Sequence, residues 1–287
     1  MWILFGAISA FFDSLLNINA KKNTKKIDAL VISWLWMLCA SPIVIIPALV
    51  FGFAEIDFVF WQALAVRTVL DTIALILYVR ALRDSQITLA QPMLGLTPVL
   101  VVFISYFLNG DIPTILAFIG ILLVGSGIYL NNRPENSKVL DPFKLIWKNK
   151  GARQMTFVAI LWACTSSLHT VAIAHSDAYT YVGIGIPVLA FVMTMIVLFT
   201  RRKETIFAFK TLPTTQLIKI GVFDGITLLA QMIGQGMVQA AYLISIKRLS
   251  MVISAFMAKK YFGEDISNRI LPISMVAIGV ILIILGK

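Results

Sequence analysis

The sequence predicts an all-α polytopic membrane protein with ten transmembrane helices in two inverted five-helix repeats. Composition, the spacing of apolar windows and the distribution of Lys and Arg lead to this class. Hydrophobic residues make up 59% of the 287 residues, charged residues 13%, and the mean hydropathy is +0.91. A soluble domain averages about 25% charged residues. A soluble chain of this length would have too few charged residues to cover its apolar surface, so the bilayer is its expected environment.

Ten apolar windows are long enough to form spanning helices, which need about 20 residues each. They cover approximately residues 2–20, 28–51, 58–80, 86–108, 113–130, 154–174, 179–199, 216–238, 241–262 and 268–286. The first window has no basic residues ahead of it and is followed by Lys21 and Lys22. A secretory signal peptide has the reverse order, so we interpret this window as a retained span.

Lys and Arg are distributed unequally between the two sides of the predicted bundle. With ten spans, 20 of the 24 basic residues fall on the side of the first, third, fifth, seventh and ninth connections. Cytoplasmic loops carry the excess of Lys and Arg, so both termini are predicted outside, in the cell (inner) membrane. The net charge of +10 is thus a topology signal, and no nucleic acid partner is expected.

The longest polar stretch, 131–153, divides the chain into a first repeat at 1–130 and a second at 154–287. Because five is odd, two such repeats in tandem insert in opposite senses, as in inverted-repeat transporters. The fourth helix ends in Tyr106-Phe107-Leu108-Asn109-Gly110-Asp111 and the ninth in Tyr261-Phe262-Gly263-Glu264-Asp265. Each is followed by an apolar helix with a central glycine, Gly125 or Gly279.

With these endings, two halves and ten spans, the whole chain resembles the EamA-type branch of the drug/metabolite transporter superfamily. The resemblance implies a central cavity formed by the first four helices of each half. It implies a scaffold role for helices five and ten, and movement of helices three, four, eight and nine. The pair Lys247-Arg248 is similar to the pair that grips phosphate in the triose-phosphate translocators of that superfamily. The fourth-helix lysine that those translocators also use has no counterpart, since 86–108 contains no Lys or Arg.

Lys247 and Arg248 are the first candidates for substrate binding. Adjacent residues on a helix point about 100° apart, so both can border one cavity without sharing a narrow face. A phosphate or carboxylate would relieve their mutual repulsion, and Arg can bind either one in a bidentate manner. The alternative is that both side chains snorkel towards the membrane surface.

Five further ionisable residues lie well away from the ends of the windows, where charge is costly and commonly functional. Arg67 and Asp71 are spaced i, i+4 on one helix face, which fits either a structural ion pair or a gate. Asp13 could carry a coupling proton or pair with Lys247 or Arg248. His169 suits proton exchange, although a packing role is the simpler alternative. Asp224 could be a coupling carboxylate or a counter-ion.

Polar and aromatic residues complete the candidate binding set. Gln231, Gln235 and Gln239 repeat at i, i+4 and i+8 and predict one polar stripe, which should line water and not lipid. Asn17 lies one turn after Asp13. Trp162 lies seven residues before His169 and could wall the cavity, with packing as the alternative.

No catalytic or metal-binding motif stands out. There is no P-loop, HExxH or GxSxG sequence, and Cys39 and Cys164 form no metal-ligand spacing. We therefore expect no enzyme activity, no cofactor and no metal.

The predicted function is secondary active transport, by alternating access, of a small organic metabolite bearing a phosphate or carboxylate. A coupling proton or counter-substrate is a further expected partner, besides membrane lipid, and the protein is expected to be a monomer or homodimer. The alternatives are an exporter of amino acids or amphipathic drug-like compounds, a lipid flippase acting on a head group, and a non-transporting scaffold or sensor.

Overall fold

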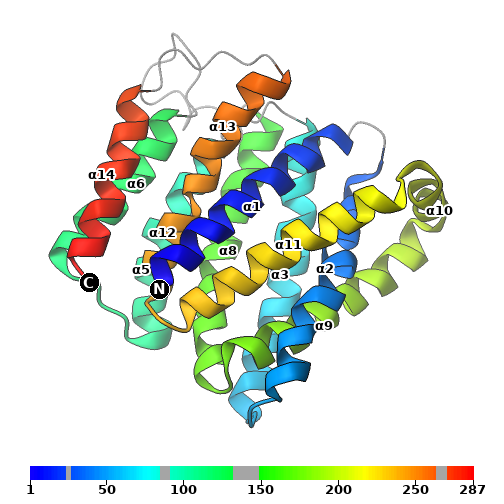
Figure 1. The fold of residues 1–287 in the computed structure, drawn as a ribbon, viewed down its shortest axis with the longest axis horizontal. Coiled ribbons are helices and arrows are strands. Elements are labelled where there is room, and N and C mark those ends of the chain that lie inside the picture. The colour runs from blue at the N-terminus through cyan, green and yellow to red at the C-terminus, as the bar shows by residue number, and fades with distance from the viewer. Residues whose placement is uncertain (24–26, 85–90, 132–148, 263–269) are drawn as a thin grey trace.

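The computed structural model describes residues 1–23, 27–84, 91–131, 149–262 and 270–287, and these residues form a bundle of helices (Figure 1). The described elements, in chain order, are α1 (Trp2–Asn23), α2 (Ala29–Phe51), α3 (Phe58–Asp84), the 3-10 helix η1 (Gln91–Leu96), α5 (Thr97–Asn109), α6 (Ile115–Asn131), α8 (Lys150–Ala174), α9 (Ala178–Thr200), α10 (Arg202–Thr211), α11 (Thr214–Gln235), α12 (Ala240–Lys247), α13 (Leu249–Phe262) and α14 (Ile270–Leu285). The part of the chain that the structure describes contains no strand. The predicted all-α polytopic membrane class is confirmed.

Length and hydropathy explain why these segments are membrane helices. Among the described residues, α1, α2, α3, α8, α9 and α11 are long and apolar enough to cross a membrane, and shorter apolar helices cover 93–109, 115–130 and 271–285. Large apolar side chains face outward from the bundle, with Phe107 82%, Ile115 83% and Phe199 86% exposed. Exposed apolar area of this extent is favourable against lipid and unfavourable against water.

Two of the predicted helices are interrupted, and one helix was not predicted. The fourth window contains η1 followed by α5, and the ninth contains α12 followed by α13, with Arg248 between them. The amphipathic α10 lies between α9 and α11, and its polar composition kept it out of the hydropathy windows. Most of the predicted linker, and Gly263, Glu264 and Asp265 of the second ending motif, lie outside the described residues.

Helices of the first half pack on helices of the second half in a reciprocal pattern. In this pattern α3 contacts α8, and α11 contacts α1. Likewise η1 and α5 contact α8, whereas α12 and α13 contact α1. The pairs α2–α9 and α6–α14 join helices of the same rank in the two halves. These pairs are the ones that an approximate two-fold relation between the halves would produce.

The two halves approach each other closely between α6 and α14. A Cβ atom built on Gly120 would lie 2.6 Å from the carbonyl oxygen of Gly279, and one built on Gly279 would lie 2.7 Å from the oxygen of Gly120. Glycine at both positions lets the two backbones touch. The facing glycine in the first half is therefore Gly120, because Gly125 contacts Gly95 of η1.

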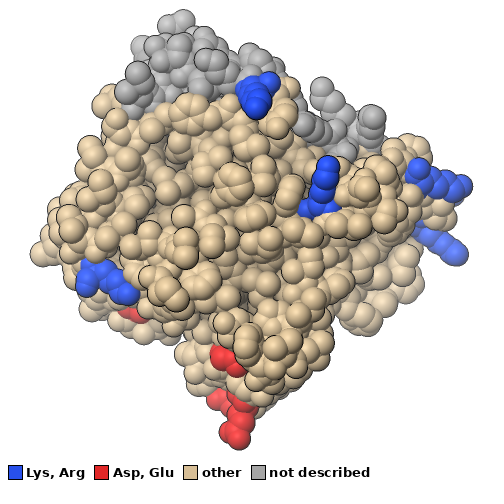
Figure 2. Space-filling view, viewed as in Figure 1, with Lys and Arg blue, Asp and Glu red and all other residues tan. Residues whose placement is uncertain are grey.

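Charged residues separate towards opposite ends of the bundle. Figure 2 shows Lys and Arg near the end of α13, beside α10 and, in one place, near the chain ends, and it shows Asp and Glu at the tip formed by the α2–α3 and α8–α9 connections. The connections 52–57, 110–114, 175–177 and 236–239 contain no Lys or Arg. The two chain ends lie together, because the Lys287 ammonium is 5.4 Å from the Trp2 ring. The side of the bundle that carries both chain ends has few Lys and Arg residues, as the sequence predicted.

Candidate functional site

A central cavity of about 110 Å³ lies between the two halves. Side chains from α1, α2, α3, η1, α8, α9, α11, α12 and α13 line it. The structure brings most of the predicted site residues together here: Asp13, Asn17, Arg67, Asp71, Trp162, His169, Asp224, Gln231, Lys247 and Arg248. Gln235 lies directly behind this lining and contacts it through Gln231. Charge inside a membrane bundle is costly, so its concentration around one cavity marks the candidate site.

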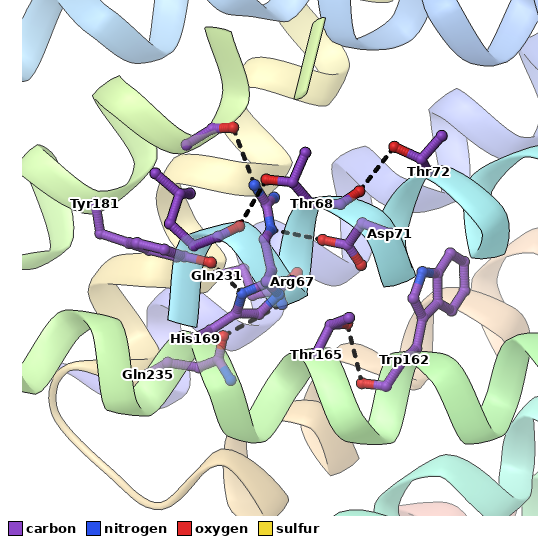
Figure 3. Close-up of polar contacts among 12 residues, drawn as sticks. Arg67, Thr68, Asp71, Thr72, Trp162, Thr165, His169, Tyr181, Gln231 and Gln235 are labelled. Atoms are coloured by element: carbon purple, nitrogen blue, oxygen red, sulfur yellow. Dashed lines mark hydrogen bonds and ion pairs between the residues drawn. The ribbon is translucent and has the colours of Figure 1, made fainter. Parts of the chain in front are cut away.

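Arg67 and Asp71 form an ion pair on α3, with 2.6 Å between Nε and Oδ2 (Figure 3). Both are buried, with 2% and 8% of their surfaces exposed. The Arg67 guanidinium also donates a hydrogen bond to the Gly185 carbonyl of α9 at 3.0 Å and lies 5.7 Å from the Tyr181 ring centre. The pair therefore links α3 to α9 at the wall of the cavity.

His169 projects from α8 and shares a hydrogen bond with the Tyr181 hydroxyl of α9, with 2.5 Å between Nδ1 and the oxygen. Tyr181 also faces Arg67, so the two contacts form one buried polar layer across α3, α8 and α9 (Figure 3). No spacing in the sequence predicted that the Tyr181 hydroxyl would be the partner of His169.

Lys247 is held by the glutamines of α11. Its Nζ donates to Oε1 of Gln231 at 2.5 Å, and Nε2 of Gln231 donates to Oε1 of Gln235 at 3.3 Å. Gln235 in turn donates to the carbonyl of Ser166 on α8 at 3.2 Å. The predicted three-glutamine stripe is wrong at Gln239, because α11 ends at Gln235 and the Gln239 amide donates to the Ile112 carbonyl at a connection.

Arg248 occupies the interruption between α12 and α13. It is 5% exposed, and its guanidinium carbon lies 5.6 Å from the centre of the Trp162 ring. The interruption of the ninth span by Lys247 and Arg248 corresponds in rank to that between η1 and α5 in the fourth. Discontinuous helices of this kind form midplane sites in secondary transporters.

Another part of the cavity lining is a chain of polar and aromatic contacts from α1 to α8. Asn17 donates to Oδ2 of Asp13 at 3.2 Å and accepts a hydrogen bond from the Tyr78 hydroxyl at 2.7 Å. The Tyr78 ring lies 4.9 Å from Trp162 and 6.1 Å from Trp36. Tyr78 lies seven residues after Asp71, and this spacing on one face of α3 is the signal that could have identified it.

Asp224 lies in α11, is 4% exposed and lines the same cavity. It interacts electrostatically with Lys247 and with Asp13. No ion pair joins it, or Asp13, to a described cation. The described residues contain no cluster of three His, Cys, Asp or Glu side chains that could hold a metal ion.

The fold and site define a polytopic membrane protein with a charged central cavity. Residues 1–133 match the sequence model of the EamA-like transporter family. The expected EamA-type resemblance within the drug/metabolite transporter superfamily is therefore confirmed, and the protein is a membrane transporter of small molecules. The similarity of Lys247-Arg248 to the triose-phosphate translocator pair stays a prediction.

The fold of the whole chain also has a structural relative. A crystal structure of another protein matches with a TM-score of 0.72 and 15% sequence identity, over 99% of this chain and 97% of the other. This likeness shows that the arrangement of both halves recurs in a solved structure. No curated protein matches the chain.

Proposed function

We propose that the protein is a secondary active transporter that moves a small organic metabolite with an anionic group by alternating access. Lys247 and Arg248 hold this group, a phosphate or carboxylate. The observation that carries the proposal is Arg248, a buried guanidinium at a helix interruption that faces the cavity and whose Nε has no hydrogen-bond partner among the described residues. An anionic oxygen would accept this hydrogen bond.

Supporting roles follow from the contacts around the cation pair. Gln231 and Gln235 orient Lys247, Trp162 supports Arg248, and Asn17 contributes a polar edge. Asp13, Asp71, His169 and Asp224 are the groups that a coupling proton or counter-substrate would engage. Arg67 holds Asp71 and connects α3 to α9, so movement of α3 would require this contact to rearrange.

The two halves, 1–130 and 154–287, act as inverted units that rock about the cavity. The reciprocal contacts of Gly120 and Gly279 support this arrangement. Four connections free of Lys and Arg support placing them, and both termini, outside the cell membrane. A topology reporter fused to the C-terminus should read outside, and a cytoplasmic signal would overturn this orientation.

Ligand binding to purified protein tests the anion site. Thermal unfolding would be titrated with small organic carboxylates and phosphates, using Lys247→Gln and Arg248→Gln. Loss of one charged hydrogen bond should weaken the apparent Kd at least about tenfold. The matched controls are Lys210→Gln and Arg202→Gln on α10, which are exposed and outside the cavity. Equal affinity in Arg248→Gln and wild type would overturn the assignment.

A further inference from the structure

Helix α10 lies at one edge of the bundle, between the end of α9 and the start of α11 (Figure 1). Both of its neighbours are long and apolar enough to cross a membrane. Phe199, one residue before the end of α9, is 86% exposed, and an apolar side chain so exposed on a spanning helix faces lipid. The bilayer therefore extends to the level at which α10 begins, and α10 lies at the membrane surface.

One face of α10 fixes the helix to the bundle. Thr205 and Ala208 on this face are buried. The Phe209 ring also lies 5.9 Å from the Trp34 ring of α2, in an edge-to-face arrangement. Through these side chains α10 contacts both α9 and α2. The contacts fix the rotation of α10 about its own axis, and they determine which side chains point away from the bundle.

The face that points away combines two lysines with two large apolar side chains. Lys203, Ile206, Phe207 and Lys210 are spaced i, i+3, i+4 and i+7, which places them on one face of the helix. All four are exposed, with 51% of Ile206 and 53% of Phe207 accessible. Basic side chains are visible beside α10 in Figure 2. We call these four residues the α10 lysine face.

The charges of the α10 lysine face are not balanced within the described part of the protein. No ion pair joins Lys203 or Lys210 to a described carboxylate. Glu204, the acidic residue of α10, lies about 100° from Lys203 around the helix axis. Two ammonium groups on either side of exposed apolar side chains match the boundary of a bilayer, where lipid phosphate meets the acyl chains. A zwitterionic headgroup balances its own phosphate, whereas an anionic headgroup leaves its charge to the lysines.

We infer that the α10 lysine face binds anionic phospholipid. Ile206 and Phe207 insert at the boundary between the headgroups and the acyl chains, and the ammonium groups of Lys203 and Lys210 contact lipid phosphate. None of the four residues lines the central cavity, so this surface is separate from the site of the proposed function.

A quencher carried by the lipid tests this contact in vesicles. In a Cys39→Ala, Cys164→Ala background, which removes both free cysteines, Ile206→Cys would carry a small fluorophore. The full chain would be reconstituted into equal parts of phosphatidylglycerol and phosphatidylcholine, so that α10 meets the same lipids in either orientation. One lipid at a time would carry the quencher, near the headgroup or near the end of an acyl chain. We expect stronger quenching from the position near the headgroup, and stronger quenching by phosphatidylglycerol than by phosphatidylcholine.

The two lysines should account for the preference for anionic lipid. Lys203→Gln and Lys210→Gln should each lower the relative affinity for phosphatidylglycerol about fivefold, which is the contribution of one basic residue near an anionic membrane surface. Added salt should weaken the preference in the same direction. Lys203→Arg should retain the preference. The matched control is Lys150→Gln at the start of α8, where the lysine is paired with Asp84, and it should behave as wild type.

Three results would overturn the inference. An absence of quenching would mean that the α10 lysine face meets water or another protein. Equal quenching by the two lipids would mean that this face contacts the bilayer without selecting charge. A preference for phosphatidylglycerol that survives both lysine substitutions would mean that other residues attract the anionic lipid. The anion site of the proposed function stands or falls separately, because it is tested with soluble ligands and with substitutions in the cavity.

Discussion

The buried Arg67–Asp71 pair yields a quantitative prediction for stability. Replacing Asp71 with Leu leaves the Arg67 guanidinium, 2% exposed, without the carboxylate that now lies 2.6 Å away. Breaking a buried ion pair by removing one partner costs about 3–5 kcal/mol. Each of Asp71→Leu and Arg67→Met should therefore lower the free energy of unfolding by about that amount.

The double variant separates a charge effect from a packing effect. With Arg67→Met and Asp71→Leu together, no charge is left unpaired, and well-packed apolar replacements of buried ion pairs are often neutral or stabilising. We expect the double variant to be more stable than either single variant, with a coupling energy of about 3 kcal/mol or more between the two sites. The measurement is reversible unfolding by sodium dodecyl sulfate in mixed micelles, followed by circular dichroism.

Helix α3 supplies a matched control. Arg83 and Asp84 also form a contact, at 2.8 Å, but the Arg83 side chain is 39% exposed. Arg83→Met should cost less than about 1 kcal/mol, as exposed pairs do. The reasoning is refuted if Asp71→Leu costs no more than Arg83→Met, or if the double variant costs the sum of its singles.

Three further predictions test other parts of the structure. Gly120→Ala and Gly279→Ala should each destabilise the protein by about 1–3 kcal/mol through overpacking, because each new Cβ would lie 2.6 or 2.7 Å from the opposing carbonyl oxygen. The control is Gly236→Ala, whose Cβ would have no neighbour nearer than 3.4 Å. If Gly120→Ala and Gly279→Ala destabilise the protein no more than the control does, the backbone contact is contradicted. Tyr181→Phe should cost about 1–3 kcal/mol, because it leaves the His169 nitrogen without its buried partner, and unchanged unfolding would show that the hydroxyl is dispensable. The Phe60 backbone N–H, with the His175 ring, lowers the pKa of the exposed Asp57 carboxyl. The stability that this carboxylate adds is therefore present near neutral pH and disappears as the pH falls below about 4. The thermal midpoints of wild type and Asp57→Asn should converge on acidification, and a difference that widens would contradict this pH dependence.

Much of the helical framework was predictable because a bilayer imposes a strong length requirement on apolar windows. The interruption at Arg248 and the short helix α10 were not predictable in this way. A hydropathy average does not detect a local change of backbone direction, and α10 is too polar to register. For the same reason Gln239 was misplaced, since helix α11 ends four residues before it.

The cavity was partly predictable from the cost of intramembrane charge. Arg67 and Asp71 were paired correctly because their i, i+4 spacing places them on one face. The contributions of Tyr78 and Tyr181 depend on which neighbouring helix each ring faces, and this depends on tertiary packing. The arrangement of Asp13, Asp224, Lys247 and Arg248 around one cavity likewise emerged only when residues from α1, α11, α12 and the interruption after α12 were brought together.

Alternating access of the central cavity is tested most directly by labelling from each side of the membrane. In a Cys39→Ala, Cys164→Ala background, which removes both free cysteines, Leu228→Cys would place a thiol on the cavity lining. Oriented proteoliposomes would be treated with a membrane-impermeant thiol reagent, applied outside or enclosed inside. Ala172→Cys, buried away from the cavity, is the control that should stay unlabelled. Alternating access predicts labelling of Leu228→Cys from both sides, and labelling from one side only, or from neither, would contradict it.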